Sequence, residues 1–379
     1  MRKPGGKVPV AWSMLLYRKG RLTLSILGIA FSVVIMFMEI GFFNGINDSQ
    51  ARLATVLNGD LVLLSRQRFN LLEDDRLNRA RMEQALAYGE VASATPLYEG
   101  FQVIQDPVTK LGRAISVLAF PPGSEPLKIP GLRDFGGLLA IRGNLLFDRL
   151  SRDIYGPVRV GTVAIVGGQP CTVVGLVAVG PSIKSDGYIL MGDETWIETD
   201  ESANWVSMAL LKLNPGADLE ALRAKLVEKM GDEASVMTPE EIRVREVNFT
   251  ARATPAGGVF SVGVLIGFAI GVIICYQILF NEITDNMPQY ATVKAIGFSK
   301  GYLVKVVMQQ ALLLAVLGFV PGLAGGLLLY AFIQHTTRIL MFVTWPRAAL
   351  VFVLTVFMCA FSGLLAVRKV LDADPAEVF

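Results

Sequence analysis

The fold of this chain is decided by one stretch of sequence, GGVFSVGVLIGFAIGVIICYQILF, which runs from Gly257 to Phe280. Its 24 residues include no Asp, Glu, Lys or Arg. A helix rises about 1.5 Å per residue, so about 20 apolar residues cross a hydrocarbon core of roughly 30 Å. The stretch is therefore predicted to be a transmembrane helix, and the chain to be a membrane protein.

Three other apolar runs extend this pattern. Val306–Ile333 and Ala348–Val367 are 28 and 20 residues long and carry no charged side chain. Leu22–Met38 has 17 uncharged residues before Glu39 interrupts it. The sequence therefore predicts an α-helical membrane protein with four transmembrane helices, over residues 22–46, 257–280, 306–333 and 348–367.

The distribution of charge predicts the topology. Residues 44–256 contain 27 acidic and 22 basic side chains, whereas the rest of the chain contains 13 basic and 6 acidic ones. Residues 1–21 carry six basic side chains and no acidic one. Because positively charged segments stay in the cytoplasm, we expect segments 1–21, 281–305 and 368–379 inside, and segments 47–256 and 334–347 outside.

The N-terminal segment leaves alternatives open. A cleaved signal peptide would share its basic start and apolar run, but no small-x-small cleavage site follows, so we expect the first helix to be retained. Val8–Tyr17 places Trp12, Leu15 and Leu16 on one helical face. This pattern is typical of an interfacial helix on the inner leaflet, and a flexible basic anchor is the alternative.

The block between the first and second helices has the composition of a folded α+β domain. Five stretches show strand or helix patterns: Gly59–Ser65, Arg76–Tyr88, Val158–Val179, Asp218–Met230 and a run that begins at Thr238. Gly59–Ser65 and Val158–Val179 are predicted as strands because they are rich in β-branched residues and glycine. The other three stretches are predicted as helices from their periodicity and start signals. Two βα units thus flank a β-rich middle, which indicates two subdomains.

Composition argues against several classes of function. Hydrophobic residues make up 53% of the chain and charged residues 18%, with a mean hydropathy of +0.50. The formal net charge of +2 offers no basic excess to a nucleic acid. His335 is the only histidine and there are three cysteines, too few for a histidine- or thiolate-built metal site. We therefore predict no catalytic residue, metal site or cofactor in the chain.

Two helices carry glycines at four-residue spacing. These are Gly263, Gly267 and Gly271 in the second helix, and Gly318, Gly322 and Gly326, with Pro321 between them, in the third. Glycine at this spacing clears one helix face for the close approach of another backbone. The sequence leaves open whether these faces form a seam that slides, in a dimer or between helices, or pack statically inside one bundle.

Glu39 is the one ionisable residue inside a predicted span. It lies about 26 Å along the helix from Leu22, near the outer interface, where a carboxylate can reach water. A solvated position and a role in proton or substrate handling both remain open. No second charge lies in the spans as a relay partner, which argues against a proton-coupled pump. Ser261 and Ser362 likewise lack a histidine or lysine partner there, which argues against an intramembrane protease.

The loop after the second helix is expected to contact a soluble partner. Pro288 breaks the chain, and the run Gln289–Ile296 (QYATVKAI) favours a short helix that ends at Gly297. A short helix joined stiffly to two membrane helices is suited to receive a mechanical push. The chain contains no G-x-x-x-x-G-K-[ST] motif, so any ATP hydrolysis must occur in another subunit.

The sequence resembles the MacB/FtsX-type permeases of ABC transporters in this loop, in its ending Asp374-Pro375-Ala376-Glu377-Val378-Phe379, and in its order of helices and exported domain. Within that family it is similar to the DevC-type permeases, through Val8–Trp12, Gly28–Phe31, Phe37-Met38 and Gly59–Leu61. The resemblance covers essentially the whole chain. Glu39 departs from it, because an uncharged polar residue is expected at that position.

The resemblance implies a homodimer in the bacterial inner membrane, with an ATPase subunit that binds ATP and magnesium under each loop. The residues it implies in ATPase coupling are Gln289, Tyr290, Ala291, Lys294, Ala295, Ile296, Gly297 and Phe298, with tail contacts at Asp374, Pro375 and Glu377. It also implies a periplasmic membrane-fusion adaptor, an outer-membrane tunnel and a lipid-like or amphiphilic cargo. An FtsX-like signal transmitter that regulates a periplasmic partner, and lipoprotein extraction, are the alternatives.

Overall fold

The structure, a computed structural model, describes residues 19–182, 184–200, 204–253, 255–285, 300–337 and 341–372. The chain divides into two compact units. The first, the bundle, comprises residues 1–44, 255–335 and 341–379; the second, the domain, comprises residues 45–254 and 336–340. Three of the predicted features fall outside the described residues: the interfacial helix, the coupling segment Gln289–Phe298 and the tail residues Asp374, Pro375 and Glu377.

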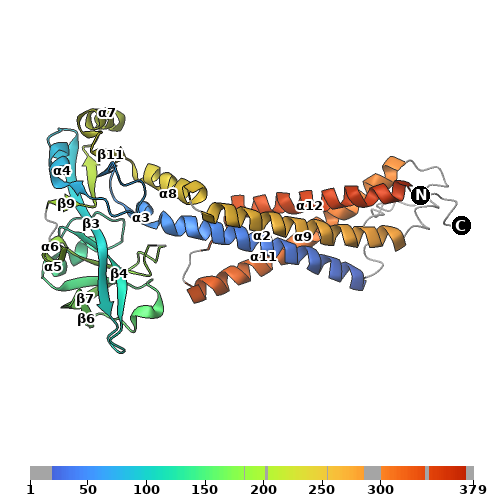
Figure 1. Cartoon of the computed structure of the whole chain (residues 1–379), viewed down its shortest axis with the longest axis horizontal. Coiled ribbons are helices and arrows are strands. Elements are labelled where there is room, and N and C mark those ends of the chain that lie inside the picture. The colour runs from blue at the N-terminus through green and yellow to red at the C-terminus, as the bar shows by residue number, and fades with distance from the viewer. Residues whose placement is uncertain are drawn as a thin grey trace, which may run out of the picture. The chain divides into compact units, whose positions relative to one another are not determined.

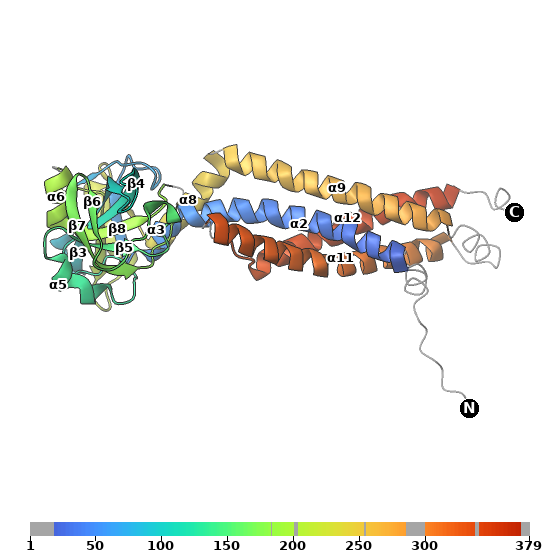
Figure 2. The same cartoon turned by 90° about the horizontal axis from the view of Figure 1, so that it is seen from below.

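Four long helices form the bundle and run side by side (Figures 1 and 2). They are α2 (Lys19–Gln50), α9 (Pro255–Asp285), α11 (Lys300–Thr337) and α12 (Trp345–Asp372). Each is long and apolar enough to cross a membrane, which confirms the four predicted transmembrane helices. Each is also longer than its apolar run, because helical hydrogen bonding continues into the polar residues at both ends. The last residues of α2, from position 45 to Gln50, belong to the domain.

The domain combines strands with short helices, as its composition predicts. Its described strands are β1 (Leu61–Ser65), β2 (Leu77–Asn78), β3 (Val91–Gln105), β4 (Gly112–Phe120), β5 (Asn144–Asp148), β6 (Val163–Val166), β7 (Gln169–Val177), β8 (Tyr188–Gly192), β9 (Trp205–Val206), β10 (Met208–Leu213) and β11 (Ala234–Met237). Its described helices are α3 (Arg52–Val56), α4 (Arg79–Leu86), η1 (Leu132–Phe135), α5 (Gly136–Leu139), η2 (Asp153–Tyr155), α6 (Asp193–Asp200), α7 (Leu219–Met230) and α8 (Pro239–Ala253).

One sheet of nine strands organises the domain, in the order β11-β1-β10-β3-β4-β8-β5-β7-β6. The long strand β3 pairs with β10 through its first half and with β4 through its second half. Near its end, Ile104 of β3 also pairs with Val166 of β6, so that the sheet from β3 to β6 closes on itself. Strand β3 therefore belongs both to an open wing, with β10, β1 and β11, and to a closed barrel-like part.

Both faces of the open wing are buried at β1, and all five residues of that strand are buried. Leu61 and Leu63 face one core, together with residues of α4 and α7. Val62 and Leu64 face a second core, together with residues of α3 and α8. A strand covered on both faces is apolar throughout rather than alternating, which explains the continuous run LVLL in the sequence.

Local sequence signals account for most element boundaries in the domain. Asp218 caps α7, because its side chain accepts the backbone N–H groups of Glu220 and Ala221. Thr238 and Glu241 form a reciprocal capping box at the start of α8, with N···O distances of 2.8 and 3.2 Å. The strands predicted over 158–179 are β6 and β7, joined at two glycines with positive φ.

One predicted helix is shorter than the sequence suggested. Residues 76–88 were expected to be helical throughout, but α4 begins only at Arg79. Leu77 and Asn78 instead form strand β2, which pairs with β9. The Asn78 side chain then caps α4 by accepting the Ala80 N–H, and asparagine favours this capping role over a helix interior. The pairing with β9 is a long-range contact that no local pattern could predict.

Candidate functional site

Gly263 and Gly267 of α9 face α2 of the same chain, whereas Gly271 lies against both Met358 of α12 and Ser32 of α2. The α2 side chains nearest to Gly263, Gly267 and Gly271 are Glu39, Ile35 and Ser32, in that order. A Cβ atom at Gly267 would lie 2.9 Å from Ile35 Cγ2, and one at Gly263 would overlap the Glu39 carboxylate. The missing side chains thus allow the two backbones to approach closely, which lipid-exposed helices need for packing.

The glycines of α11 face another side of the same helix α2. Their nearest neighbours are Ile29 for Gly318, Val33 for Gly322 and Phe37 for Gly326. A Cβ atom at Gly322 would lie 2.6 Å from Val33 Cβ. The helix α11 continues without a break through Pro321, which is exposed. Both glycine stripes are therefore occupied within the chain, and α2 lies between α9 and α11.

A tyrosine joins α11 to the C-terminal half of α2. The Tyr330 hydroxyl donates a hydrogen bond to the backbone carbonyl of Phe37, and the ring passes over Gly41, where any Cβ atom would overlap it. Tyr330 is 4% exposed. A buried hydroxyl in an apolar bundle needs such a partner, since an unsatisfied one is costly. Tyr330 was not predicted as a packing residue, although it is the one tyrosine within the third apolar run.

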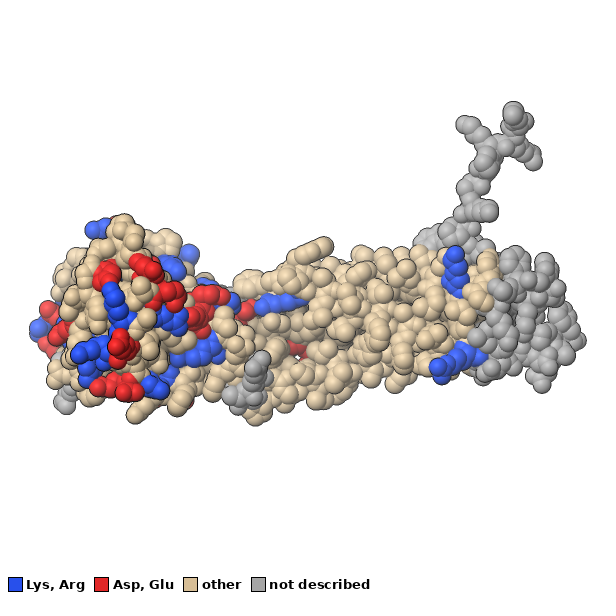
Figure 3. Space-filling model, turned by 90° about the horizontal axis from the view of Figure 1, so that it is seen from above, with Lys and Arg blue, Asp and Glu red and all other residues tan. Residues whose placement is uncertain are grey.

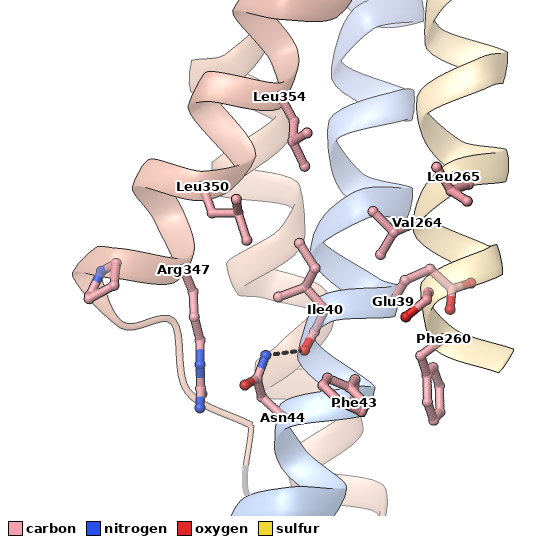
Figure 4. Close-up of a pocket in the computed structure, with 12 residues that line it drawn as sticks. Glu39, Ile40, Phe43, Asn44, Phe260, Val264, Leu265, Arg347, Leu350 and Leu354 are labelled. Carbon is pink, nitrogen blue, oxygen red and sulfur yellow. Dashed lines mark hydrogen bonds between the residues drawn. The ribbon is translucent and has the colours of Figure 1, made fainter. Parts of the chain in front are cut away.

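A cavity of about 660 Å³, here called the outer cavity, lies between α2, α9 and α12 (Figure 4). Its polar lining residues are Glu39, Asn44, Ser261 and Arg347. Its apolar lining residues are Ile40, Phe43, Phe260, Val264, Leu265, Pro346, Leu350 and Leu354. Figure 4 shows Arg347 and Asn44 at one end of the cavity and Leu354 at the other. Phe43 and Phe260 lie at the same end as Asn44, and Glu39 lies on the side of α9, so this end combines polar groups with two aromatic rings.

Two polar groups of the outer cavity are held by backbone carbonyls, one in the same helix and one in the segment before α12. Asn44 donates to the Ile40 carbonyl at 2.7 Å, and Arg347 Nη1 donates to the Phe342 carbonyl at 3.0 Å. Glu39 is half-buried between Gly263 and the cavity. Arg347 lies in the segment 334–347 that was expected before the fourth span, because its charge ends the apolar run, whereas the structure places it in α12. A Trp-Pro pair directly before it marks the helix start and could have corrected this.

The opposite end of the bundle contains paired polar groups. Arg21 of α2 forms an ion pair with Asp285 of α9. Gln310 of α11 donates to Glu282 of α9 at 3.4 Å, and both side chains are buried. These contacts join three helices next to the ends of the loop that contains the predicted coupling segment. The coupling residues themselves lie outside the described residues.

The domain contains a buried ionic network that was not predicted from the sequence. Arg68, 1% exposed, pairs with Glu99 at 2.5 Å and donates to the carbonyls of Ser207 and Leu71. Lys184 lies 3.3 Å from the same glutamate. Charged side chains cover the domain surface, whereas few lie on the visible face of the bundle (Figure 3). Most of the charged side chains of the domain are solvated, whereas Arg68 and Glu99 are buried. A buried ion pair must offset the cost of removing both charges from water.

A second buried acid, Glu246 of α8, joins three segments of the domain. Its Oε2 accepts the Leu71 N–H at 3.0 Å and the Gln50 side chain at 3.3 Å. Arg245 lies 3.6 Å from its other oxygen. Burial raises the pKa of Glu246 and lowers that of Arg245, so each charge is held against a desolvation cost. Across the described ranges, no group of three or more His, Cys, Asp or Glu side chains could hold a metal ion.

Two family models together match most of the chain. Residues 22–229 match the MacB-like periplasmic core domain, and residues 261–375 match the FtsX-like permease C-terminal region. The first match covers α2 from residue 22 and the domain as far as α7, but not β11 or α8. The second covers α11 and α12 with most of α9. No curated protein matches the chain in sequence.

Solved structures of exported domains are also similar to this chain. The periplasmic region of MacB from Actinobacillus actinomycetemcomitans is 12% identical, with a TM-score of 0.35, over 50% of this chain and 92% of that one. The extracellular domain of the noncanonic ABC-type transporter YknZ from Gram-positive bacteria is 11% identical, with a TM-score of 0.34, over 48% of this chain and 100% of that one.

Proposed function

The chain belongs to the MacB/FtsX-type permeases of ABC transporters, and from this premise we propose that it is the membrane-spanning subunit of an ATP-driven exporter. The observation that carries the proposal is the pair of family matches, over residues 22–229 and 261–375. Permeases of this family associate with ABC ATPase subunits and are normally non-catalytic. ATP and magnesium are accordingly assigned to a partner ATPase.

The proposed mechanism transmits movement from the coupling segment Gln289–Phe298 to the domain. ATP-driven closure of the ATPases would push this segment and displace the helices that flank it, α9 and α11. The close glycine contacts of both helices with α2 support a concerted displacement, because packed backbones move together. Helix α2 then continues into the domain as one unbroken helix to Gln50. The coupling free energy between two sites in such a switch is typically about 1–3 kcal/mol.

The cargo assigned by this proposal is lipid-like or amphiphilic, as in DevC-type permeases, and the domain acts on it with a membrane-fusion adaptor and an outer-membrane tunnel. The chain would lie in a bacterial inner membrane as a homodimer, with both termini in the cytoplasm. Exposed apolar side chains on α2 and α9, such as Phe31 and Ile273, fit contact with a second copy or with lipid.

The test is affinity purification of the tagged chain from its native membrane in mild detergent, followed by mass spectrometry. We expect an ABC ATPase and a periplasmic adaptor to be recovered in fixed ratio to the chain. Recovery of an ATPase together with a cell-wall hydrolase would contradict export and support signal transmission instead. Failure to recover any ATPase in several mild detergents would contradict the permease proposal itself.

A further inference from the structure

Gln277 places an amide inside the membrane span of α9. It lies six residues from Gly271, the middle of the span Gly257–Asp285, which corresponds to about 9 Å along the helix. This depth falls within a hydrocarbon core that extends about 15 Å on either side of its centre. Helical side chains lean towards the N-terminus of their helix, so that of Gln277 leans away from the nearer end of the span. The amide is therefore directed into hydrocarbon rather than towards water.

The Gln277 amide forms no hydrogen bond with the described residues, and its side chain is exposed. Other polar side chains of the bundle do have partners: Gln310 donates to Glu282, and Ser362 donates to the carbonyl of Val272. Lipid chains offer an amide neither a donor nor an acceptor, and an unpaired amide in an apolar medium costs free energy. A partner for Gln277 must therefore come from outside the described part of this chain.

Large apolar side chains surround this amide. Gln277 lines a groove between α2 and α9 of about 610 Å³, here called the Gln277 groove. Leu24, Leu27 and Phe31 line it from α2, and Ile273, one turn from Gln277, lines it from α9. Each of these four side chains is more than half exposed. Uncovered apolar side chains around one hydrogen-bonding group are suited to the packed contact of another membrane helix.

We propose that the Gln277 groove is the contact with a second copy of the chain, in which the two Gln277 amides hydrogen-bond to each other. Two copies with the same topology are related by a two-fold axis along the membrane normal, so equivalent residues lie at equal depth. An amide both donates and accepts, so it can pair with its own copy, whereas a charged side chain would meet a like charge. A second copy thus supplies a partner at this depth, which lipid does not. The inference rests on the homodimer of the proposed function and identifies the face that forms it.

The test measures dimerisation of the full chain in lipid vesicles. Copies that carry a donor or an acceptor fluorophore are reconstituted together at increasing ratios of lipid to protein, and energy transfer gives the dimer fraction. We expect Gln277→Leu to dimerise about tenfold more weakly than the native chain, because it loses the paired amide bonds. Gln277→Asn keeps an amide and should retain most of the dimerisation.

A second pair of variants tests the apolar part of the contact. Ile273→Ala should weaken dimerisation, because it removes contact area in the Gln277 groove. Leu328 of α11 is similarly exposed but does not line the groove, so Leu328→Ala is the matched control and should dimerise like the native chain.

Cross-linking then locates the contact. The three native cysteines are buried, so the native chain is the blank. With an added oxidant, Ile273→Cys should form a covalent dimer in the vesicles and Leu328→Cys should not. Undiminished dimerisation of Gln277→Leu, or cross-linking through Leu328→Cys alone, would overturn the inference. A native chain that stays monomeric at every lipid ratio would show that lipid covers the groove, and would refute it as well.

These outcomes are separate from the test of the proposed function. If an ABC ATPase is recovered with the chain but the contact lies on another face, only the inference about the Gln277 groove fails. If the Gln277-dependent dimer forms but no ATPase is recovered, the permease proposal fails and the interface stands.

Discussion

The Gln50 side chain donates a hydrogen bond to Oε2 of Glu246, 3.3 Å away, although 196 positions separate the two residues in the chain. Gln50 is the last residue of α2, and Glu246 lies within α8. The same oxygen accepts the N–H of Leu71 in the loop after β1. One fully buried carboxylate therefore joins the end of α2, this loop and α8. In the proposed mechanism, this junction is where displacement of α2 enters the domain.

Replacement of this carboxylate should loosen the junction. Glu246→Ala leaves the Leu71 N–H and the Gln50 amide without their acceptor inside the domain, at a cost of about 3 kcal/mol. Local opening should then become roughly a hundredfold more frequent. Hydrogen exchange of the full chain in detergent measures this at Leu71. Glu240→Ala, an exposed position on the same helix, is the control and should leave exchange unchanged. Unaltered protection in Glu246→Ala would contradict the assigned role.

The stability of the domain should depend on pH through Glu246. Burial raises the pKa of this carboxyl above its ordinary value of 4.5 and outweighs the hydrogen bonds that lower it. The folded domain therefore binds this proton more tightly than the unfolded chain does. The contribution of Glu246 to stability is greatest below pH 4.5 and is lost as the pH rises through the raised folded-state pKa.

A variant without this ionisation isolates the effect. Glu246→Gln keeps an oxygen acceptor but carries no titrating proton, so its melting temperature should change less than that of the native chain from about pH 5 to about pH 8. Thermal unfolding of both proteins in the same buffers measures the difference. If the two melting curves shift in parallel over this range, Glu246 does not titrate as its burial predicts.

The buried pair of Arg68 and Glu99 should be essential for stability. Arg68→Met removes one charge and leaves the carboxylate of Glu99 with Lys184 alone, so we expect a loss of about 3 kcal/mol. Arg66→Met is a matched control two residues away. Arg66 is mostly exposed, and its distance to Asp232 is 3.6 Å, so its loss should cost less than about 1 kcal/mol. Chemical denaturation followed by tryptophan fluorescence measures the free energy of unfolding of both variants. Equal losses in Arg68→Met and Arg66→Met would refute the stabilising role of the buried pair.

The sequence predicts local features of this chain better than long-range ones. The four spans follow from uninterrupted apolar runs, and the start of α8 from Thr238 and Glu241, because these signals act within a few residues. The glycines of α9 and α11 identify packing faces, but only the structure identifies their partners, which are α2 for most of them and also Met358 of α12 for Gly271. The bond between Gln50 and Glu246 joins residues that no short pattern connects.

The positions of charged residues in or next to the apolar runs could be predicted only in part from the sequence. Arg347 ends an apolar run and so was assigned to a loop, although it lies in the first turn of α12 and lines the outer cavity. Glu39, by contrast, is recognisable from the sequence alone, because charge is rare within spans. Its neighbours on α9 and α12 come from segments more than 200 positions away, so its environment could not be derived from the sequence.

The close contact between α11 and α2 should tolerate no added methyl group. In Gly322→Ala the new Cβ would lie 2.6 Å from Val33 Cβ, and overpacking of this kind costs about 1–3 kcal/mol. Gly258→Ala, on α9, is the control, because no atom lies within 4 Å of its added Cβ. The melting temperature of the full chain in detergent should fall for the first variant only. Equal melting temperatures would show that the seam is looser than these contacts indicate.

Coupling to the ATPase should fail when the segment Gln289–Phe298 is altered. Lys294→Glu reverses a charge that the family resemblance places against the ATPase, and like charges at such a contact weaken binding. We expect ATP hydrolysis by the co-purified complex to lose its dependence on the permease, while the chain remains folded and in the membrane. Gly297→Trp should have the same effect, because its large side chain would obstruct the contact with the ATPase. Lys110→Glu, an exposed charge reversal in the domain, is the control and should leave ATPase activity unchanged.

The decisive comparison is between assembly and activity in the same preparation. If Lys294→Glu retains both its ATPase partner and normal stimulation of hydrolysis, then the contact lies elsewhere on the chain and the coupling assignment is wrong. If the partner is lost entirely, the segment contributes to binding, and Gly297→Trp then separates binding from transmission. A folded, ATPase-bound chain that no longer stimulates hydrolysis would support the transmission of movement through α9 and α11, because these two helices flank the segment in sequence.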